Sequence, residues 1–290
     1  MTTFRRVDDL RAQGGHPVPA YLFEPEDVVG GAVVLHGHSH AKEESLGLSA
    51  RLAEAGIAAL AIDLRGHGAN RSQLDEGVVG DVEAAVDFVR RFGPAAVIGH
   101  SLGGRLALMS AADLAVAISP AIPTQVSPSA RTMFIQFPSP SVREPYPGYV
   151  LDLLKKLGPP PIRGGPTLLV SARYDAPSIR EGTRELAARL PRGDYREVEE
   201  ELRPPGAFGH PVLDYLPYWL NHRQMLLNPE VLRIVPAWLG EEFARLPRQR
   251  TTARIDRPAA ADRAAGRRRT RAGARRTPPR APRARPPRRG

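Results

Sequence analysis

The hydrophobic pattern of the chain alternates between two kinds of segment. Short runs that are apolar at every position indicate strands buried on both faces, as in parallel sheets. Between them, apolar residues recur every three or four positions, which is the spacing of a helix that buries one face. This alternation predicts a doubly wound, mostly parallel α/β sheet. The predicted strands are 32–35, 57–62, 95–98, 114–118 and 167–170, and the predicted helices are 43–55, 81–92, 102–112 and 178–190.

Two further strands and one helix are predicted nearer the ends. Residues 16–24 indicate an edge strand, because Pro17 and Pro19 would interrupt the hydrogen bonds of a central strand. Residues 195–198 indicate the last strand, and the stretch 213–227 has a helical pattern.

The alternation of strands and helices is interrupted twice. Residues 120–165 are rich in proline, serine and glycine, and only 149–157 has a helical pattern, which indicates an insertion over the sheet that forms a small lid. Residues 248–290 consist mostly of arginine, proline, alanine and glycine. Such a segment cannot bury enough apolar area to offset its conformational entropy, so we expect it to be disordered. The sequence therefore predicts one α/β domain over 1–247, followed by a basic tail.

The positive charge of the chain is concentrated in this tail. The tail contains 16 arginines, no lysine and two acids, so the formal charge of +10 belongs to the tail and residues 1–247 are mildly acidic. The tail is the candidate for salt-sensitive contacts with nucleic acid or with an anionic membrane. Because no aromatic residues alternate with the arginines to stack on bases, a solvated extension is the favoured interpretation.

Cysteine is absent from the sequence. This excludes disulfides, thiolate metal sites and a cysteine nucleophile. The N-terminus lacks the apolar region of a signal peptide, and the longest apolar runs, such as 57–62, fall far short of the ~18 residues that cross a membrane. These features predict a soluble protein of the cytoplasm.

The strongest chemical signal is Gly99-His100-Ser101-Leu102-Gly103, which lies between a buried strand and an apolar helix. A G-x-S-x-G sequence in this context is typical of the nucleophile elbow, a sharp turn that presents serine at the N-terminus of a helix. Side chains two positions before and after the serine would collide, so both positions are glycine. The backbone N–H groups and the dipole of the helix favour an oxyanion beside Ser101.

Three alternating histidines, His36, His38 and His40, suggest a competing metal site. On an extended strand their side chains would share one face. The similarity to the HxHxDH motif of metallo-β-lactamases is faint, because His40 and Ala41 stand where that motif has Asp-His. No thiolate is available to complete a site, although a carboxylate could do so. The nucleophile elbow explains more of the chain, so chemistry without a metal is favoured.

Together with the elbow, three other motifs resemble the α/β-hydrolase family over about residues 17–245. The closest similarity is to the esterases, lactonases and serine peptidases with a short lid. The resemblance implies an oxyanion hole formed by the amides of His38 and Leu102. The three motifs are His36-Gly37-His38-Ser39, similar to the oxyanion loop, Asp63-Leu64-Arg65-Gly66-His67-Gly68, similar to the D-x-R-G-x-G turn, and the pair Asp175 and His210. Within that turn we interpret Arg65 and His67 as structural.

A serine nucleophile needs a base, and the base needs a carboxylate that orients it. In this family they follow the serine in the order Asp, His. Asp175 follows the strand 167–170 in a short loop, which places it at the carboxyl edge of the sheet, where open α/β proteins bind ligands. His210 lies in a Gly-His loop after the last predicted strand, as the catalytic histidine of the family does. The alternative acid is Asp194, and the alternative base is His222 inside the predicted helix.

The predicted reaction is hydrolysis of an ester or related acyl bond through an acyl-enzyme on Ser101, with no metal or organic cofactor. The same triad serves lactonases, thioesterases, peptidases, acyltransferases and C–C bond hydrolases, which the elbow does not separate. A binding protein that kept the fold and lost the chemistry is the alternative from another class, although the filled catalytic positions favour an enzyme. Aromatic residues that would suit an apolar substrate group are Phe134, Phe137, Tyr146, Tyr149, Tyr215, Tyr218 and Trp219.

Overall fold

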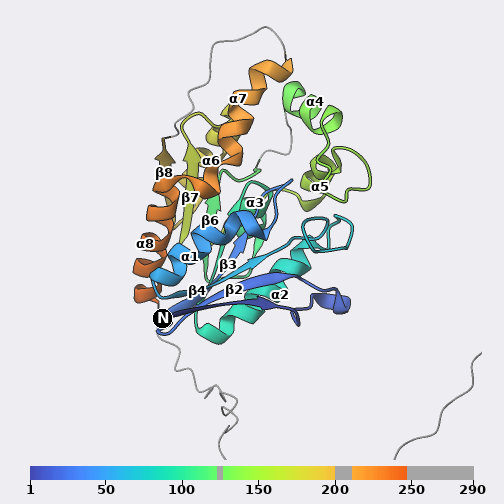
Figure 1. Cartoon of the computed structure of the whole chain (residues 1–290). Coiled ribbons are helices and arrows are strands. Elements are labelled where there is room, and N and C mark those ends of the chain that lie inside the picture. Colours follow the sequence, from blue (N-terminus) through green and yellow to red (C-terminus); the bar gives the residue numbers. More distant parts are fainter. Residues whose placement is uncertain (123–126, 200–210, 247–290) are drawn as a thin grey trace, which may run out of the picture. The chain divides into compact units, whose positions relative to one another are not determined.

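The computed structural model describes residues 1–122, 127–199 and 211–246 (Figure 1). These residues belong to one compact unit, Met1–Thr251. The predicted tail, 248–290, and the predicted base, His210, lie outside the described residues.

An eight-stranded sheet forms the centre of this unit, in the order β1-β2-β4-β3-β5-β6-β7-β8. Neighbouring strands from β4 to β8 pair in parallel, whereas β1 pairs with β2 and β2 with β4 in antiparallel fashion. The predicted, mostly parallel sheet is thereby confirmed. The strands are β1 (Thr2–Val7), β2 (Ala20–Pro25), β3 (Gly30–Leu35), β4 (Ile57–Ile62), β5 (Ala95–His100), β6 (Leu114–Ile118), β7 (Thr167–Ala172) and β8 (Gly193–Val198).

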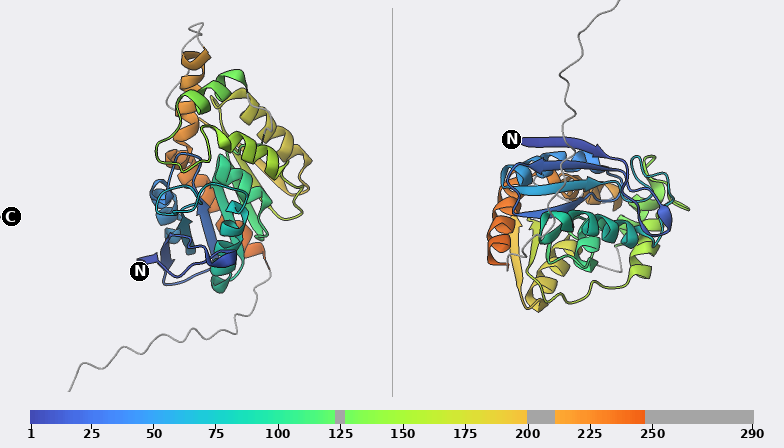
Figure 2. Two further views of the ribbon diagram at one scale, coloured as in Figure 1. Left: turned by 90° about the vertical axis from the view of Figure 1, so that its right-hand side faces the viewer. Right: turned by 90° about the horizontal axis from the view of Figure 1, so that it is seen from below.

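Helices cover both faces of the sheet (Figure 2). Val33 and Leu35 belong to one buried cluster with residues of α2, α3 and α5, whereas the alternate residue Val34 belongs to a second cluster with residues of α1 and α8. Both faces are buried at the centre of the sheet, which explains why β4 and β6 are apolar at every position. The helices are α1 (Leu46–Glu54), α2 (Val78–Val89), α3 (Leu102–Met109), α4 (Pro128–Gln136), α5 (Tyr149–Leu157), α6 (Pro177–Arg189), α7 (Pro211–Arg223) and α8 (Pro229–Arg245). Within the described residues, every helix is too short or too polar to cross a bilayer.

The N-terminal part of the sheet differs from the prediction. The strand predicted over 16–24 corresponds to β2, which is not an edge strand because β1 covers it. Pro17 and Pro19 precede β2, so they do not interrupt its ladder. The pattern does not predict β1, since its first five residues are exposed and only Val7 is buried.

Between β6 and β7 the chain forms α4 and α5, and we call residues 119–166 the β6–β7 segment. The predicted helix 149–157 coincides with α5. The pattern does not predict α4, which begins where Ser127 accepts a hydrogen bond from the amide of Ala130. The lid predicted over 120–165 falls in this segment, and its action as a lid stays a prediction.

Candidate active site

The strand β5 ends at His100 and the helix α3 begins at Leu102, so Ser101 alone forms the turn between them. Ser101 has φ +52° and ψ −113°, a strained conformation for a residue with a side chain. A Cβ at Gly99 would lie 2.0 Å from the carbonyl oxygen of Gly103, and a Cβ at Gly103 would lie 2.6 Å from the carbonyl oxygen of His36. These close backbone approaches explain both glycines of the motif.

The loop after β3 packs directly on this turn. A Cβ at Gly37 would lie 2.8 Å from His100 Nδ1 and 3.2 Å from Ser101 Cβ. In the part of the chain that the structure describes, neither the amide of His38 nor that of Leu102 donates a hydrogen bond within the protein. Both amides belong to residues that line the same pocket as Ser101.

Apolar and polar side chains line the pocket around Ser101 in equal number. The β6–β7 segment supplies much of this lining, and α7 contributes Trp219. Of the aromatic residues considered from sequence, Phe134 and Trp219 line the pocket, whereas Phe137 and Tyr146 are exposed. The lining residues are His38, Ser39, His40, His100, Ser101, Leu102, Ala121, Ser127, Ala130, Phe134, Val150, Leu151, Leu154, Ser178, Ile179, Trp219, His222 and Arg223.

Asp175 contacts His222. The carboxylate follows β7, is 1% exposed, and accepts a hydrogen bond from His222 Nδ1, which lies 3.1 Å from Oδ1 and 3.3 Å from Oδ2. The imidazole of His222 lines the pocket and packs on the ring of His100, with 4.7 Å between the ring centroids. The alternative acid, Asp194, lies on β8 and forms an ion pair with Arg196 at 2.7 Å. The predicted acid therefore contacts the alternative base, while His210 lies outside the described residues.

Burial lowers the pKa values of four other histidines near Ser101. Burial lowers the pKa of His36 and brings the pKa values of His67 and His100 well below the ordinary value of 6.5. Burial, followed by the charge of Arg223, lowers the pKa of His40 to about 3.

The three alternating histidines do not converge on a common point. His36 Nδ1 donates to the carbonyl of Gly37 and its Nε2 accepts from the amide of Leu64, His38 bonds Glu144, and His40 stacks on His100. Among the described residues, no group of three or more histidine, cysteine or acidic residues is placed to hold a metal ion.

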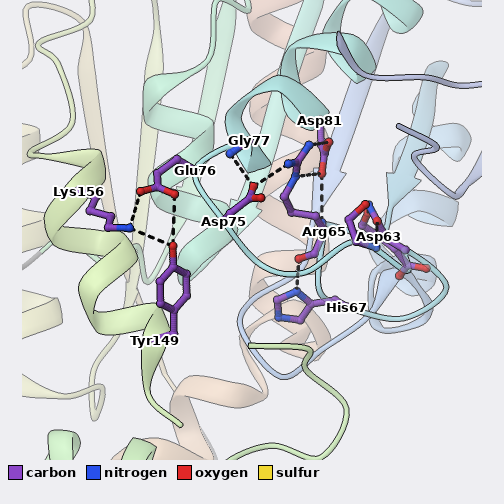
Figure 3. Close-up of polar contacts among 11 residues, drawn as sticks. Asp63, Arg65, His67, Asp75, Glu76, Gly77, Asp81, Tyr149 and Lys156 are labelled. Carbon is purple, nitrogen blue, oxygen red and sulfur yellow. Dashed lines mark hydrogen bonds and ion pairs between the residues drawn. The ribbon is translucent and has the colours of Figure 1, made fainter. Parts of the chain in front are cut away.

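Ion pairs hold the D-x-R-G-x-G turn after β4 (Figure 3), and two of them, Lys42–Asp63 and Arg65–Asp81, are buried. Asp63 accepts hydrogen bonds from the amide of Ala69 at 2.8 Å and from Lys42 Nζ at 2.7 Å. Arg65 pairs with Asp81 at 2.7 Å and with Asp75 at 2.6 Å. The structural interpretation of Arg65 is confirmed by these contacts, whereas the sequence does not indicate Lys42 as the partner of Asp63.

Replacing Asp81 by asparagine is expected to lower the free energy of unfolding by about 3 kcal/mol, because Arg65 then remains buried without its main charge partner. The side chains of Arg65 and Asp81 are 8% and 1% exposed, whereas Asp75 is 50% exposed. Asp75→Asn is the matched control and is expected to cost less than about 1 kcal/mol. Urea unfolding at neutral pH measures both variants, and equal losses would contradict the prediction.

A model of the alpha/beta hydrolase family matches residues 32–289, so this chain belongs to that family. No curated protein matches the chain. Among solved structures, the chain is similar to a hyperthermophilic esterase from Pyrobaculum calidifontis, with 19% identity, a TM-score of 0.55 and coverage of 84% of this chain and 83% of that one.

Two further solved structures have the same fold. An esterase from Pyrococcus furiosus is 17% identical with a TM-score of 0.55, covering 84% of this chain and 92% of that chain. A dienelactone hydrolase from Anabaena variabilis is 19% identical with a TM-score of 0.53, covering 85% of this chain and 99% of that chain. These similarities establish the shared fold of the proteins.

Proposed function

We propose that the protein is a serine hydrolase that cleaves carboxylic esters, with Ser101 as nucleophile, His222 as base and Asp175 as the acid that orients the base. The observation that carries this proposal is the contact between Asp175 and His222 at the pocket that contains Ser101. The three residues also follow the order Ser, Asp, His along the chain, as in other members of the family.

His222 is preferred to His210 as the base because of its partner. A catalytic imidazole needs a carboxylate at Nδ1 to fix its tautomer and to stabilise its cation. Asp175 makes this contact with His222 in the described structure, whereas His210 lies outside the described residues. His210 remains the alternative base.

The reaction proceeds in two half-reactions. His222 Nδ1–H donates a hydrogen bond to the carboxylate of Asp175, so Nε2 carries no proton. Nε2 therefore takes the proton of Ser101 as Oγ attacks the ester carbonyl. The amides of His38 and Leu102 stabilise the tetrahedral oxyanion. His222 then protonates the leaving alcohol as the C–O bond breaks. Water repeats the attack on the acyl-enzyme and releases the acid.

The lining of the pocket favours a substrate with an apolar part. Phe134, Leu154 and Trp219 would pack on an acyl or alcohol group, and the described lining contains Arg223 but no carboxylate. This charge pattern favours neutral or anionic substrates over cationic ones. Lactones and thioesters are the alternative substrates on the same triad, and a binding protein without catalysis is the alternative from another class.

Two measurements on the same preparation test this function. The protein is expected to hydrolyse p-nitrophenyl esters, with an acyl-chain preference that reports the depth of the pocket. A fluorophosphonate is expected to label it once per chain, and peptide mass spectrometry should place the label on Ser101. Labelling of another residue would refute the assignment of the nucleophile. An inert protein that also resists the label would favour the binding protein.

A further inference from the structure

Glu144 joins the β6–β7 segment to the loop that carries His38. Its Oε1 accepts hydrogen bonds from His38 Nε2 and from the amide of Val150, both at 3.0 Å, and its Oε2 accepts from the amide of Gly148 at 3.2 Å. The side chains of His38 and Glu144 are 8% and 7% exposed. Burial raises the pKa of Glu144, but these hydrogen bonds outweigh burial and leave the pKa below its ordinary value. Glu144 is therefore ionised at neutral pH and only accepts hydrogen bonds.

An ionised Glu144 requires a proton on Nε2 of His38. Because the carboxylate only accepts hydrogen bonds, Nε2 must donate to it. Ser39 Oγ lies at hydrogen-bond distance, 2.9 Å, from His38 Nδ1. Ser39 has φ +68°, which is uncommon outside glycine, and this hydrogen bond helps to hold it there. Ser39, His38 and Glu144 thus form one hydrogen-bonded chain at the edge of the pocket.

Backbone contacts anchor the residues next to Glu144 and next to His38. The neighbour of Glu144, Arg143, donates its amide to the carbonyl of Gly66 at 2.8 Å and accepts from the amide of Leu74 at 2.9 Å. Gly37, the residue before His38, packs on the turn that presents Ser101. A displacement of the His38 ring therefore moves backbone that lies against the nucleophile.

We propose that Glu144 is a positioning residue that holds the His38 amide in place as an oxyanion donor by fixing the His38 side chain. This inference rests on the proposed function. Oxyanion donors act through preorganisation, and removing one costs on the order of 10²–10³ in rate. Loosening a donor is expected to cost less, about 10–100-fold in kcat. The β6–β7 segment would then belong to the catalytic machinery as well as to the wall of the pocket.

Glu144→Gln tests the proposal, because it keeps the size of the side chain and removes its charge. We expect kcat to fall by about 10–100-fold while KM changes by less than about threefold. The affinity for an aryl trifluoromethyl ketone, whose adduct with serine carries the oxyanion, should fall by the same factor. The affinity for the free product acid should not change, since that ligand carries no tetrahedral oxyanion.

Glu76→Gln is the matched control. Glu76 pairs with Lys156 at 2.7 Å and accepts from the hydroxyl of Tyr149 at 3.3 Å, so it also ties α5 to the loop after β4 without touching His38 (Figure 3). If kcat depended on any contact that anchors the β6–β7 segment, Glu76→Gln would lower kcat as much as Glu144→Gln does. The proposal expects a kcat close to that of the wild type for Glu76→Gln and partial rescue by Glu144→Asp.

The outcomes separate this inference from the proposed function. If the wild-type protein hydrolyses esters and Glu144→Gln has the same kcat, the positioning role is overturned and the proposed function stands. A fall in kcat without weaker binding of the ketone, or with equal weakening of product binding, would also overturn it. If Glu144→Gln does not fold, Ser39→Ala provides the same comparison at the other end of the chain. Wild-type protein that is inert toward esters would overturn both proposals.

Discussion

Replacing His222 by alanine is expected to lower kcat for ester hydrolysis by on the order of 10⁴-fold. His222 Nδ1 lies 3.1 Å from Asp175 Oδ1, which leaves Nε2 as the acceptor for the proton of Ser101. Without the imidazole, the serine hydroxyl must lose its proton to water. Ser101→Ala is expected to cause the same loss, because neither group works without the other. Steady-state kinetics with a p-nitrophenyl ester measures both variants.

His210→Ala is the matched control for this prediction, since it removes an imidazole at the position that the sequence favours. We expect its kcat to stay within a few fold of the wild type. The double variant His210→Ala/His222→Ala should then be no slower than His222→Ala alone. The reverse pattern, with an inactive His210→Ala and an active His222→Ala, would return the role of base to His210.

Gly99→Ala is expected to prevent the turn at Ser101 from forming and to lower the free energy of unfolding by more than about 4 kcal/mol. The new Cβ would lie 2.0 Å from the carbonyl oxygen of Gly103 and 2.6 Å from the amide nitrogen of Gly104. Both atoms belong to the backbone of α3, so no side-chain rotation relieves the contact. Such a loss is close to the entire stability of many domains, about 5–15 kcal/mol.

Gly80→Ala is the matched control for this substitution. Gly80 lies within α2, and a Cβ there would meet no heavy atom within 4 Å. Alanine is favoured over glycine inside a helix by about 1 kcal/mol, so the variant should be as stable as the wild type or slightly more stable. Urea unfolding followed by circular dichroism measures both variants. A Gly99→Ala protein as stable as the wild type would show that the turn tolerates a side chain.

The buried strands are the part of the fold that sequence predicts best. The ranges 57–62 and 114–118 coincide with β4 and β6, because every position is apolar and both ends are marked by polar or glycine residues. The sequence predicts β2 as an edge strand, since the polar β1 that covers it carries no hydrophobic pattern. The helix α4 is weakly amphipathic and therefore also escapes a prediction from pattern.

Some residues of the site can also be predicted from the sequence, and others cannot. The turn at Ser101 is marked by the local motif of residues 99–103 between a strand and a helix, so the local sequence is sufficient to predict it. The position of Asp175 follows from the end of β7, which the hydrophobic pattern also reveals. In contrast, Glu144 lies 106 residues from His38 in sequence, and nothing in the pattern indicates that their side chains meet.

For this protein the amino-acid sequence was sufficient for the family, the parallel sheet and the serine at its carboxyl edge, because each depends on short-range pattern and local backbone geometry. Only the tertiary structure placed His222 against Asp175 and Glu144 against His38. Those contacts depend on how α7 and the β6–β7 segment pack over the sheet. Such packing is the sum of many long-range contacts, so a short stretch of sequence cannot determine it.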